Sequence, residues 1–469
     1  MLFNSLDFLV FFPLVTVLYF LIPHRVRWLH LLIASCIFYM SFIPAYILIL
    51  LFTITLDYVV SLAMEKVQGR LRKLFLAMSL AGNLGVLGVF KYGHFFIAQV
   101  NVLLSAFHTP VSLPLWDIVL PIGLSFHTFQ AMSYTIEVYR GRYPAERHFG
   151  LFALYVLFYP QLLAGPIERP SGLLRQLHEK HFFSWADMGA GFRLMLWGFF
   201  KKVVIADRLA GFVNDVYSNV DHLSSGYVVL AVLFFSFQIY CDFSGYSDIA
   251  IGAARTMGIR LMTNFDRPYS AGNIRAFWAR WHISLTSWFR DYVYIPLGGN
   301  RLGKQRKYFN VVLVFLLSGL WHGAGWNFVV WGALHALLMV IWMSYSGRQE
   351  KKASGGSIGR GFAVVGTFLL VSLGWVFFRC PDIGQALHII SHLIGHSGNP
   401  GFERNITKTT VALGMVFISF LLLVERWTTP GMDELQGRFW PDVGFCAVVP
   451  GSILLFGVFG SQPFIYFQF

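Results

Sequence analysis

Residues 311–343 read VVLVFLLSGLWHGAGWNFVVWGALHALLMVIWM. Two apolar runs, Val311–Leu320 and Phe328–Met343, make up most of this stretch, and His322 and His335 lie just after the first run and inside the second. An ionisable side chain in hydrocarbon is costly unless it stays neutral, is paired or lines a wet cavity. The stretch therefore predicts membrane helices and marks its two histidines as candidates for a functional site.

The rest of the chain has the same apolar character. Of its 469 residues, 56% are hydrophobic and 13% are charged, which is about half the charged share of a soluble domain. Crossing the bilayer core takes ~20 helical residues, so the shorter runs must be tilted, partly buried or broken. We expect one all-α polytopic membrane domain, residues 1–469, with about 11 transmembrane or re-entrant helices. The other runs are Phe8–Ile22, Leu29–Ile43, Tyr46–Met64, Leu74–Val89, Leu151–Ala164, Tyr227–Ile239, Phe362–Phe378, Val411–Val424 and Phe445–Phe459.

Basic segments predict the topology. The first apolar run has no basic segment before it and no small-residue cleavage site after it, so we do not expect a cleavable signal peptide. Short segments rich in Lys and Arg follow at Arg25–Arg27, Glu65–Lys73, Arg301–Lys307 and Arg348–Arg360. Such segments favour the cytoplasm, which places the N-terminus on the extracytoplasmic side.

The net charge of +13 has two interpretations. Basic cytoplasmic loops facing anionic membrane lipid account for it without a further function. Alternatively, some of the arginines bind an anionic cofactor at the cytoplasmic face. Nucleic acid is not an expected partner, because the charge is spread over many loops. The four cysteines are isolated, and no spacing is typical of metal ligands, so we expect no disulfide and no metal site.

Two polar segments precede the histidines. In the first, Asp242 and Asp248 interrupt an apolar stretch, and six residues of helix turn them ~600° apart, onto different faces. This favours a structural polar cluster over a paired-carboxylate site, unless Gly245 bends the chain. The second, Phe277–Asn300, has tryptophans at helical spacing. It is typical of an interfacial anchor helix.

A functional interpretation of the second segment is also open. Arg280 and Arg290 could bind the phosphates of a nucleotide-like cofactor, because a guanidinium stays charged and binds phosphate in a bidentate manner. His282 would then line the pocket.

The two histidines of the opening stretch suit acyl transfer to a hydroxyl, which needs a base that is neutral and able to accept a proton. Burial favours the neutral imidazole. His322 and His335 are thirteen residues apart, about 140° around a straight helix, so they would not meet on one helix. A break at Gly323–Gly325 would reorient them. Taken alone, a histidine on an apolar helix is more often a hydrogen-bonded structural residue than a catalytic one.

These segments, in this order, resemble the membrane-bound O-acyltransferase family, in particular its bacterial branch of alginate and peptidoglycan O-acetyltransferases. Two positions depart from the family text: Ala279 replaces the first of two arginines, and Cys241 replaces Phe. The resemblance runs through Cys241–Asp248, Asn264–Ser270, Phe277–Arg301, Gly319–His335, Trp375–Arg379 and Phe464–Phe469.

The resemblance implies that His322 is the catalytic histidine, that His282 occupies the family's Asn-or-His position and that His335 supports them. It implies cytoplasmic acetyl-CoA as the acyl donor and a central tunnel past His322. Beyond the tunnel we expect an extracytoplasmic acetyltransferase partner protein and a polysaccharide acceptor, at a bacterial inner membrane. The residues assigned to the donor site are Arg280, Trp281, Arg290 and Asn327.

Three functions remain to be separated. O-acetylation of alginate or an alginate-like exopolymer is the first, and O-acetylation of peptidoglycan uses the same chemistry. The third is a proton-coupled transporter in which Asp242, Asp248 and the histidines form a relay. Transporters usually contain repeated halves, and we find none in the sequence. Whether His322 carries the acetyl group or acts only as a base also stays open.

Overall fold

The computed structural model describes residues 1–116, 118–163, 165–349, 357–403, 408–427, 439–459 and 464–465. Most of the basic segment Arg348–Arg360 and the last four residues of the Phe464–Phe469 motif therefore lie outside the described residues. Every regular element within them is a helix, which confirms the all-α prediction. The chain forms two compact units, Met1–Gly191 with Ala253–Met262 and Phe192–Gly252 with Thr263–Phe469.

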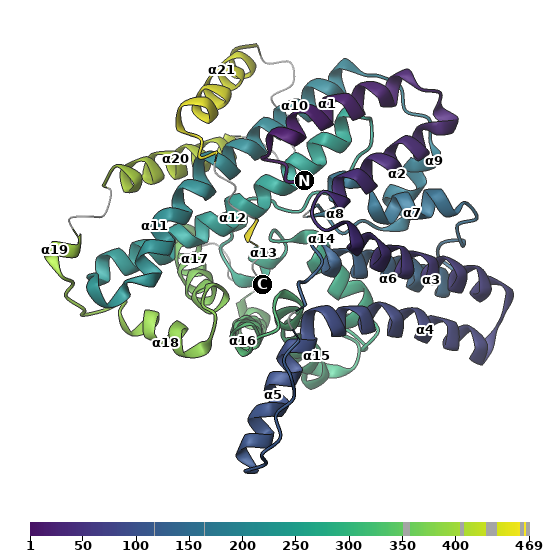
Figure 1. The fold of residues 1–469 in the computed structure, drawn as a ribbon. Helices are drawn as coiled ribbons and strands as arrows, with labels where there is room; N and C mark the ends of the chain where they lie inside the picture. The colour runs from purple at the N-terminus through teal and green to yellow at the C-terminus, as the bar shows by residue number, and fades with distance from the viewer. Residues whose placement is uncertain are drawn as a thin grey trace. The chain divides into compact units, whose positions relative to one another are not determined.

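The first unit is built around α3, α4 and α6, which lie side by side (Figure 1). Its α-helices are α1 (Leu6–Leu21), α2 (His24–Met40), α3 (Ile47–Lys66), α4 (Gly69–Leu87), α5 (Gly93–Ala106), α6 (Leu124–Tyr139), α7 (Phe149–Leu157), α8 (Tyr159–Leu162), α9 (Arg175–His178) and the start of α10 (Trp185–Phe199). Shorter helical turns are η1 (Pro44–Tyr46), η2 (Gly88–Tyr92) and η3 (Pro170–Leu174).

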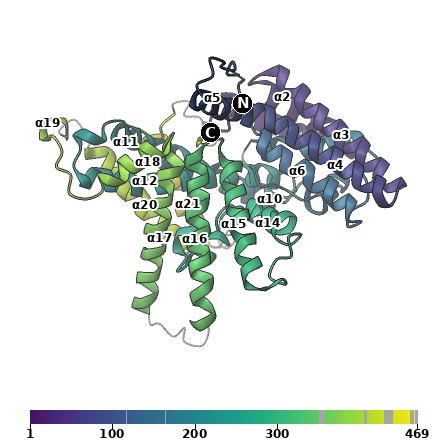
Figure 2. The same cartoon turned by 90° about the horizontal axis from the view of Figure 1, so that it is seen from below.

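The second unit contains the three segments that the sequence marks as functional. Its α-helices are α11 (Asp207–Ser218), α12 (Ser225–Thr256), α13 (Ile274–Trp278), α14 (Ile283–Phe289), α15 (Gly303–His322), α16 (Trp326–Gln349), α17 (Ser357–Arg379), α18 (Ile383–Ser391), α19 (Pro400–Glu403), α20 (Lys408–Trp427) and α21 (Phe439–Phe456). Shorter helical turns are η4 (Phe200–Ala206), η5 (Val220–His222), η6 (Pro268–Ser270) and η7 (Arg290–Tyr294). Figure 2 shows α15, α16 and α17 next to one another.

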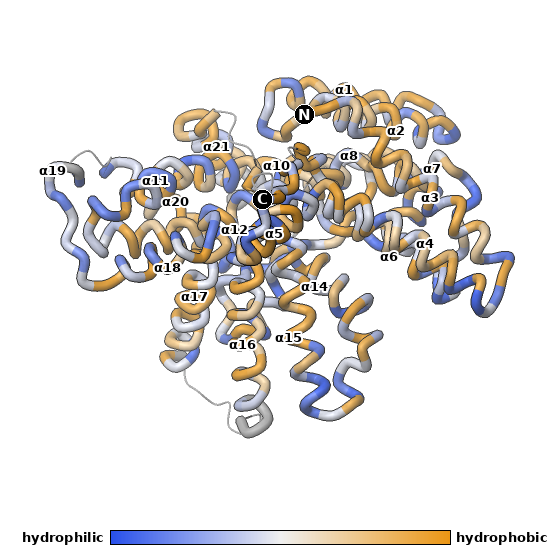
Figure 3. Tube along the Cα trace, turned by 60° about the horizontal axis from the view of Figure 1, so that its bottom comes forward, coloured by the Kyte–Doolittle hydropathy of each residue, from blue (hydrophilic) through white to orange (hydrophobic). Residues whose placement is uncertain are grey.

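Six helices of the described chain are long and apolar enough to cross a membrane, which makes this a multi-pass membrane protein. Helix α3 has apolar side chains on its outer face and polar side chains inside the protein, the reverse of a helix on the surface of a soluble protein. Its Leu48 and Phe52 face outward, whereas Thr53 and Asp57 are completely buried. Figure 3 shows hydrophobic residues along most of α3 and α4 and hydrophilic residues at the turn that joins them. The six stretches are 44–66, 69–106, 225–256, 326–345, 358–379 and 408–427.

Asp242 and Asp248 both form ion pairs with buried lysines. Lys202 Nζ lies 2.6 Å from Asp242 Oδ1 and 2.8 Å from Asp207 Oδ1, and Lys201 Nζ lies 2.6 Å from Asp248 Oδ2. These pairs agree with the structural interpretation of the two aspartates. Gly245 does not break α12. A Cβ there would lie 2.7 Å from the Gly198 carbonyl oxygen, so Gly245 permits a close crossing of two helices.

The prediction of an interfacial anchor helix over Phe277–Asn300 is wrong. The segment is divided into α13, α14 and η7, and His282 between the first two has a left-handed φ of 45°. Trp278, Trp281 and Trp288 are at most 7% exposed, so they are packed inside the protein and cannot anchor it at headgroup depth. Helical spacing identified one face of the segment but not what covers it.

Candidate active site

The three candidate histidines come together in one aromatic cluster of the second unit. Helix α15 ends at His322, Gly323 is extended with φ −159° and ψ 151°, and α16 starts at Trp326. The predicted break therefore turns one apolar stretch into two packed helices. His322 and His335 lie on different helices and contact the same ring, that of Trp331, with centroid distances of 5.0 and 4.9 Å.

His282 approaches the cluster from the start of α14. Its ring centroid lies 6.4 Å from that of His322 and 4.6 Å from that of Phe243 on α12. The His282 side chain is fully buried, and burial lowers its pKa to about 3. The imidazole therefore stays neutral at physiological pH.

The walls around His322 and His335 are aromatic. Trp321 and Phe378 lie 4.9 and 5.3 Å from His322 between ring centroids. Trp278 lies 5.0 Å from His335. Neither ring nitrogen of His335 has a hydrogen-bond partner among the described residues, although the side chain is completely buried. Such a group calls for an explanation beyond packing, and a functional role supplies one.

A cavity of about 480 Å³ adjoins this cluster between α13, α14, η7, α15 and α16. Trp278 and Phe315 line it, and both contact the His335 ring. Ser318 also lines the cavity, one helical turn before His322. The cavity therefore ends at side chains that cover His335, and it approaches His322 within one helical turn.

Three cations line the same cavity, namely Arg275, Arg290 and Lys307. Arg290 is exposed and pairs with Asp291 at 2.8 Å. Arg275 lies over the Trp342 ring, 5.4 Å from its centroid. A cationic lining that leads to an aromatic end suits a ligand with anionic groups and a short apolar arm.

Only one of the four residues assigned to the donor site lines this cavity. Arg290 does, whereas Arg280 donates to Ser270 Oγ at 2.7 Å. Trp281 is buried against Trp375, at a centroid distance of 4.8 Å. Asn327 Nδ2 donates to the Cys380 carbonyl at 2.8 Å, so it fixes the start of α16 to the end of α17.

Sequence reasoning missed Arg275, Lys307 and Ser318 as lining residues. The sequence marks Lys307 only as part of a basic loop. Arg275 lies three residues before Trp278, next to a segment that combines cationic and aromatic residues. This position is the feature of the sequence that could have identified Arg275.

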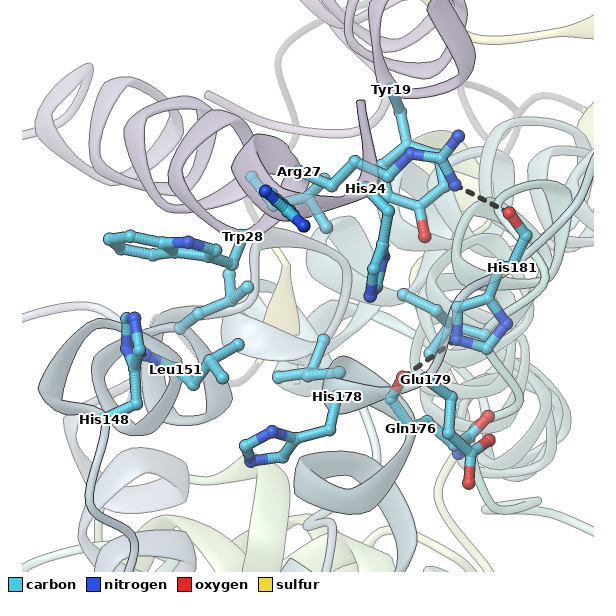
Figure 4. A pocket seen from close by; sticks show the side chains of 15 residues that line it. Tyr19, His24, Arg27, Trp28, His148, Leu151, Gln176, His178, Glu179 and His181 are labelled. Carbon is cyan, nitrogen blue, oxygen red and sulfur yellow. Dashed lines mark hydrogen bonds between the residues drawn. The ribbon is translucent and has the colours of Figure 1, made fainter. Parts of the chain in front are cut away.

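A second cavity, of about 260 Å³, lies within the first unit and is lined by four histidines (Figure 4). Several of its polar groups are engaged in structural bonds. Arg27 Nη1 donates to the His181 carbonyl at 2.6 Å, and His181 Nε2 bonds the Gln176 carbonyl at 2.9 Å. His178 pairs with Glu146 at 2.7 Å. The Arg27 bond attaches the start of α2 to residues 176–181, and the other two bonds fix that segment, so we interpret the cluster as structural.

Glycines bring α15 and α16 close enough to position the histidines. A Cβ on Gly332 would lie 2.4 Å from the Phe315 carbonyl oxygen, and one on Gly319 would lie 2.3 Å from that of Phe328. Both clashes are with backbone, so a side chain at either position must separate the helices. Because Trp331 is the neighbour of Gly332, separation would also move the ring between the histidines.

We therefore expect Gly332→Ala to lower stability by about 1–3 kcal/mol and to reduce activity more than stability alone explains. Thermal unfolding in detergent and turnover per folded molecule measure the two effects. Gly366→Ala on α17 is the matched control, because a Cβ there meets no atom within 4 Å. Equal stability and equal turnover of Gly332→Ala and Gly366→Ala would contradict the role of Gly332 in positioning the histidines.

Three buried histidines lie beside a cavity that is lined by cations and by aromatic rings, in a multi-pass helical protein. This arrangement defines a membrane enzyme suited to acyl transfer. Comparison with known proteins agrees. The family model described as MBOAT, membrane-bound O-acyltransferase family, matches residues 117–372. The chain belongs to this family, and it is an acyltransferase.

Individual relatives have names that differ in acceptor. A probable alginate O-acetylase AlgI of Azotobacter vinelandii is 39% identical over 510 aligned residues that cover all of both chains. A peptidoglycan O-acetyltransferase of Helicobacter pylori is 35% identical over 79% of this chain and 74% of its own. A teichoic acid D-alanyltransferase of Bacillus subtilis is 27% identical over 60% of this chain and 74% of its own.

Proposed function

We propose that this protein transfers acetyl groups from cytoplasmic acetyl-CoA for the O-acetylation of an exported polysaccharide, alginate or an alginate-like exopolymer. One observation carries the proposal. A cavity lined by Arg275, Arg290 and Lys307 ends at aromatic side chains that touch His335, and Ser318 in its lining lies one helical turn before His322. The full-length similarity to alginate O-acetylases supports the choice of acceptor.

The chemistry follows from the environment of the histidines. We assign His322 the role of general base, which accepts the proton of the acceptor hydroxyl while its oxygen attacks the thioester carbonyl. The carbon–sulfur bond then breaks, and coenzyme A leaves as the thiol after taking up a proton. His282 and His335, both buried, position the reacting groups, and the aromatic walls exclude water that would hydrolyse the thioester.

The cationic lining would hold the donor phosphates. Arginine and lysine bind phosphate through charge-assisted hydrogen bonds, each worth about 1.5–3 kcal/mol. In this proposal Arg290, Arg275 and Lys307 contact the coenzyme, whereas Trp281, Asn327 and Arg280 hold the surrounding helices in place. No metal is needed for this transfer.

We expect Arg290→Ala and Lys307→Ala each to raise the KM for acetyl-CoA about 10-fold or more, with a smaller effect on kcat. Initial rates of coenzyme A release by the purified protein give both constants. Lys304→Ala is the matched control, because Lys304 lies one turn from Lys307 on α15 and does not line the cavity. An unchanged KM for acetyl-CoA in both Arg290→Ala and Lys307→Ala would show that the donor does not bind in this cavity.

Two exported polymers are candidates for the acceptor. Peptidoglycan is the second candidate, favoured by the relative from H. pylori. Incubation of membranes with acetyl-labelled acetyl-CoA and either polymer separates the two, provided that an extracytoplasmic acetyltransferase partner is present. Label in alginate, absent from peptidoglycan, is the expected result.

The membrane arrangement completes the proposal. We infer about 11 transmembrane or re-entrant helices around a central tunnel, in a bacterial inner membrane, with the N-terminus on the extracytoplasmic side. The six long apolar helices support the multi-pass part of this arrangement. Two shorter apolar helices, Leu6–Leu21 and Gly444–Phe456, are candidates for tilted or partial spans.

A further inference from the structure

A cluster of histidines outside the candidate active site surrounds one carboxylate. His388 lies on α18, His392 directly follows this helix, and Asp221 belongs to η5, more than 160 residues earlier. His388 Nε2 is 2.9 Å and His392 Nε2 is 3.4 Å from the same oxygen, Asp221 Oδ1. One ligand atom from each of the three residues lies within 4.8 Å of the other two.

These separations fit a divalent transition metal. Bonds of ~2.0–2.1 Å in a tetrahedral zinc site place neighbouring ligand atoms roughly 3.3 Å apart. The two distances to Asp221 Oδ1, 2.9 and 3.4 Å, lie on either side of this value. Two imidazoles and one carboxylate are ligands of open zinc sites, in which the fourth position is left to water.

The orientation of His392 also suits a ligand. Its Nδ1 lies 2.9 Å from the His388 carbonyl oxygen, which can only accept a hydrogen bond. This bond assigns the proton to Nδ1 and leaves the Nε2 lone pair directed at the cluster, as in metal-binding histidines.

The backbone around the cluster is fixed before any metal binds. Ser225 N donates to the His396 carbonyl at 3.1 Å, and His396 N donates to Ser225 Oγ at 2.9 Å. Asn399 N donates to the His222 carbonyl at 2.9 Å. The segment after α18 is thereby attached to the last residue of η5 and to the chain just after it, so the ligands need little reorganisation to bind a cation.

We propose that Asp221, His388 and His392 form a site for a divalent transition metal, with Zn²⁺ as the preferred ion. The side chains of Asp221 and His388 are 65% and 44% exposed, so the ion can enter from solvent. The bound ion links α18 to η5 and stabilises this part of the second unit. The site is separate from the chemistry proposed above, and its test does not depend on acyl transfer.

The test uses the full-length protein, purified in detergent through a tag without histidine and stripped with a chelator. Titration with Co²⁺, read by its visible absorption, followed by displacement with Zn²⁺, gives stoichiometry and affinity. We expect one ion per chain, a Zn²⁺-dependent rise in Tm, and at least about 100-fold weaker binding in both His388→Ala and His392→Ala.

The control is His178→Ala, because His178 also pairs with a carboxylate, Glu146, at 2.7 Å but does so without a second imidazole. Its metal affinity should equal that of the unmodified protein. Asp221→Asn keeps a hydrogen-bonding oxygen but removes the charge, and it should also weaken binding. Absence of stoichiometric Co²⁺ and Zn²⁺ binding, or binding that survives both histidine substitutions, would overturn the proposal and leave the cluster as ion pairs.

Discussion

His322→Ala is expected to abolish acetyl transfer while the protein still inserts and folds. Loss of a positioned general base lowers turnover by about 10²–10⁴-fold. His322 is 3% exposed, between Trp321, Trp331 and Phe378, so no solvent group can readily take its place. Coenzyme A release by the purified protein and the acetyl content of the polymer measure the effect.

A paired substitution separates chemistry from folding. His322→Gln keeps a polar side chain of similar size but cannot act as a base, so it should be as inactive as the alanine variant. His30→Gln is the control, since His30 bonds the Val15 carbonyl at 2.9 Å in the first unit and lies outside the site. Normal turnover in His322→Gln, with equal amounts of folded protein, would show that His322 is not the base.

The largest effect on stability is expected from Lys202→Met. Lys202 is 1% exposed and neutralises two buried carboxylates, Asp207 and Asp242, at 2.8 and 2.6 Å. Removing one member of a buried ion pair costs about 3–5 kcal/mol, because the remaining charge is left uncompensated. Here two charges remain, so we expect a cost at the upper end of that range.

Thermal unfolding in detergent tests this prediction, and two further variants define its cause. Replacing Asp207 and Asp242 by Asn in the Lys202→Met background removes both carboxylates and should recover most of the stability. Arg175→Ala breaks an exposed pair with Glu179 at 3.2 Å, with side chains 73% and 50% exposed, and should change stability by less than about 1 kcal/mol. A Lys202→Met protein as stable as Arg175→Ala would show that the carboxylates are neutral or hydrated.

The helical class and the hairpin of the candidate site follow from local sequence. Apolar runs on either side of Gly323–Gly325 predicted two helices joined by a break, and α15 and α16 have this form. The cost of buried charge predicted that Asp242 and Asp248 need partners. It could not identify Lys201 and Lys202, because a partner some forty residues away is selected by packing and not by spacing.

The Phe277–Asn300 segment shows where pattern reasoning fails. Its tryptophan spacing fits one amphipathic helix, and periodicity does not reveal a left-handed residue such as His282, at φ 45°. The same spacing serves a membrane surface or a protein core, since both are apolar. Because Trp278 and Trp281 are buried, the tryptophan spacing here belongs to the protein core and not to a membrane surface.

The sequence by itself determined that this protein is a helical membrane protein with histidines in apolar surroundings, because the cost of burying polar groups is a local property of each stretch. Its motifs also determined the family. Only the tertiary structure decided that His282, His322 and His335 share one aromatic cluster, and that Arg275, Arg290 and Lys307 line the cavity beside it. These groups come from five different helical elements, and contacts between such elements depend on how complete side-chain surfaces pack.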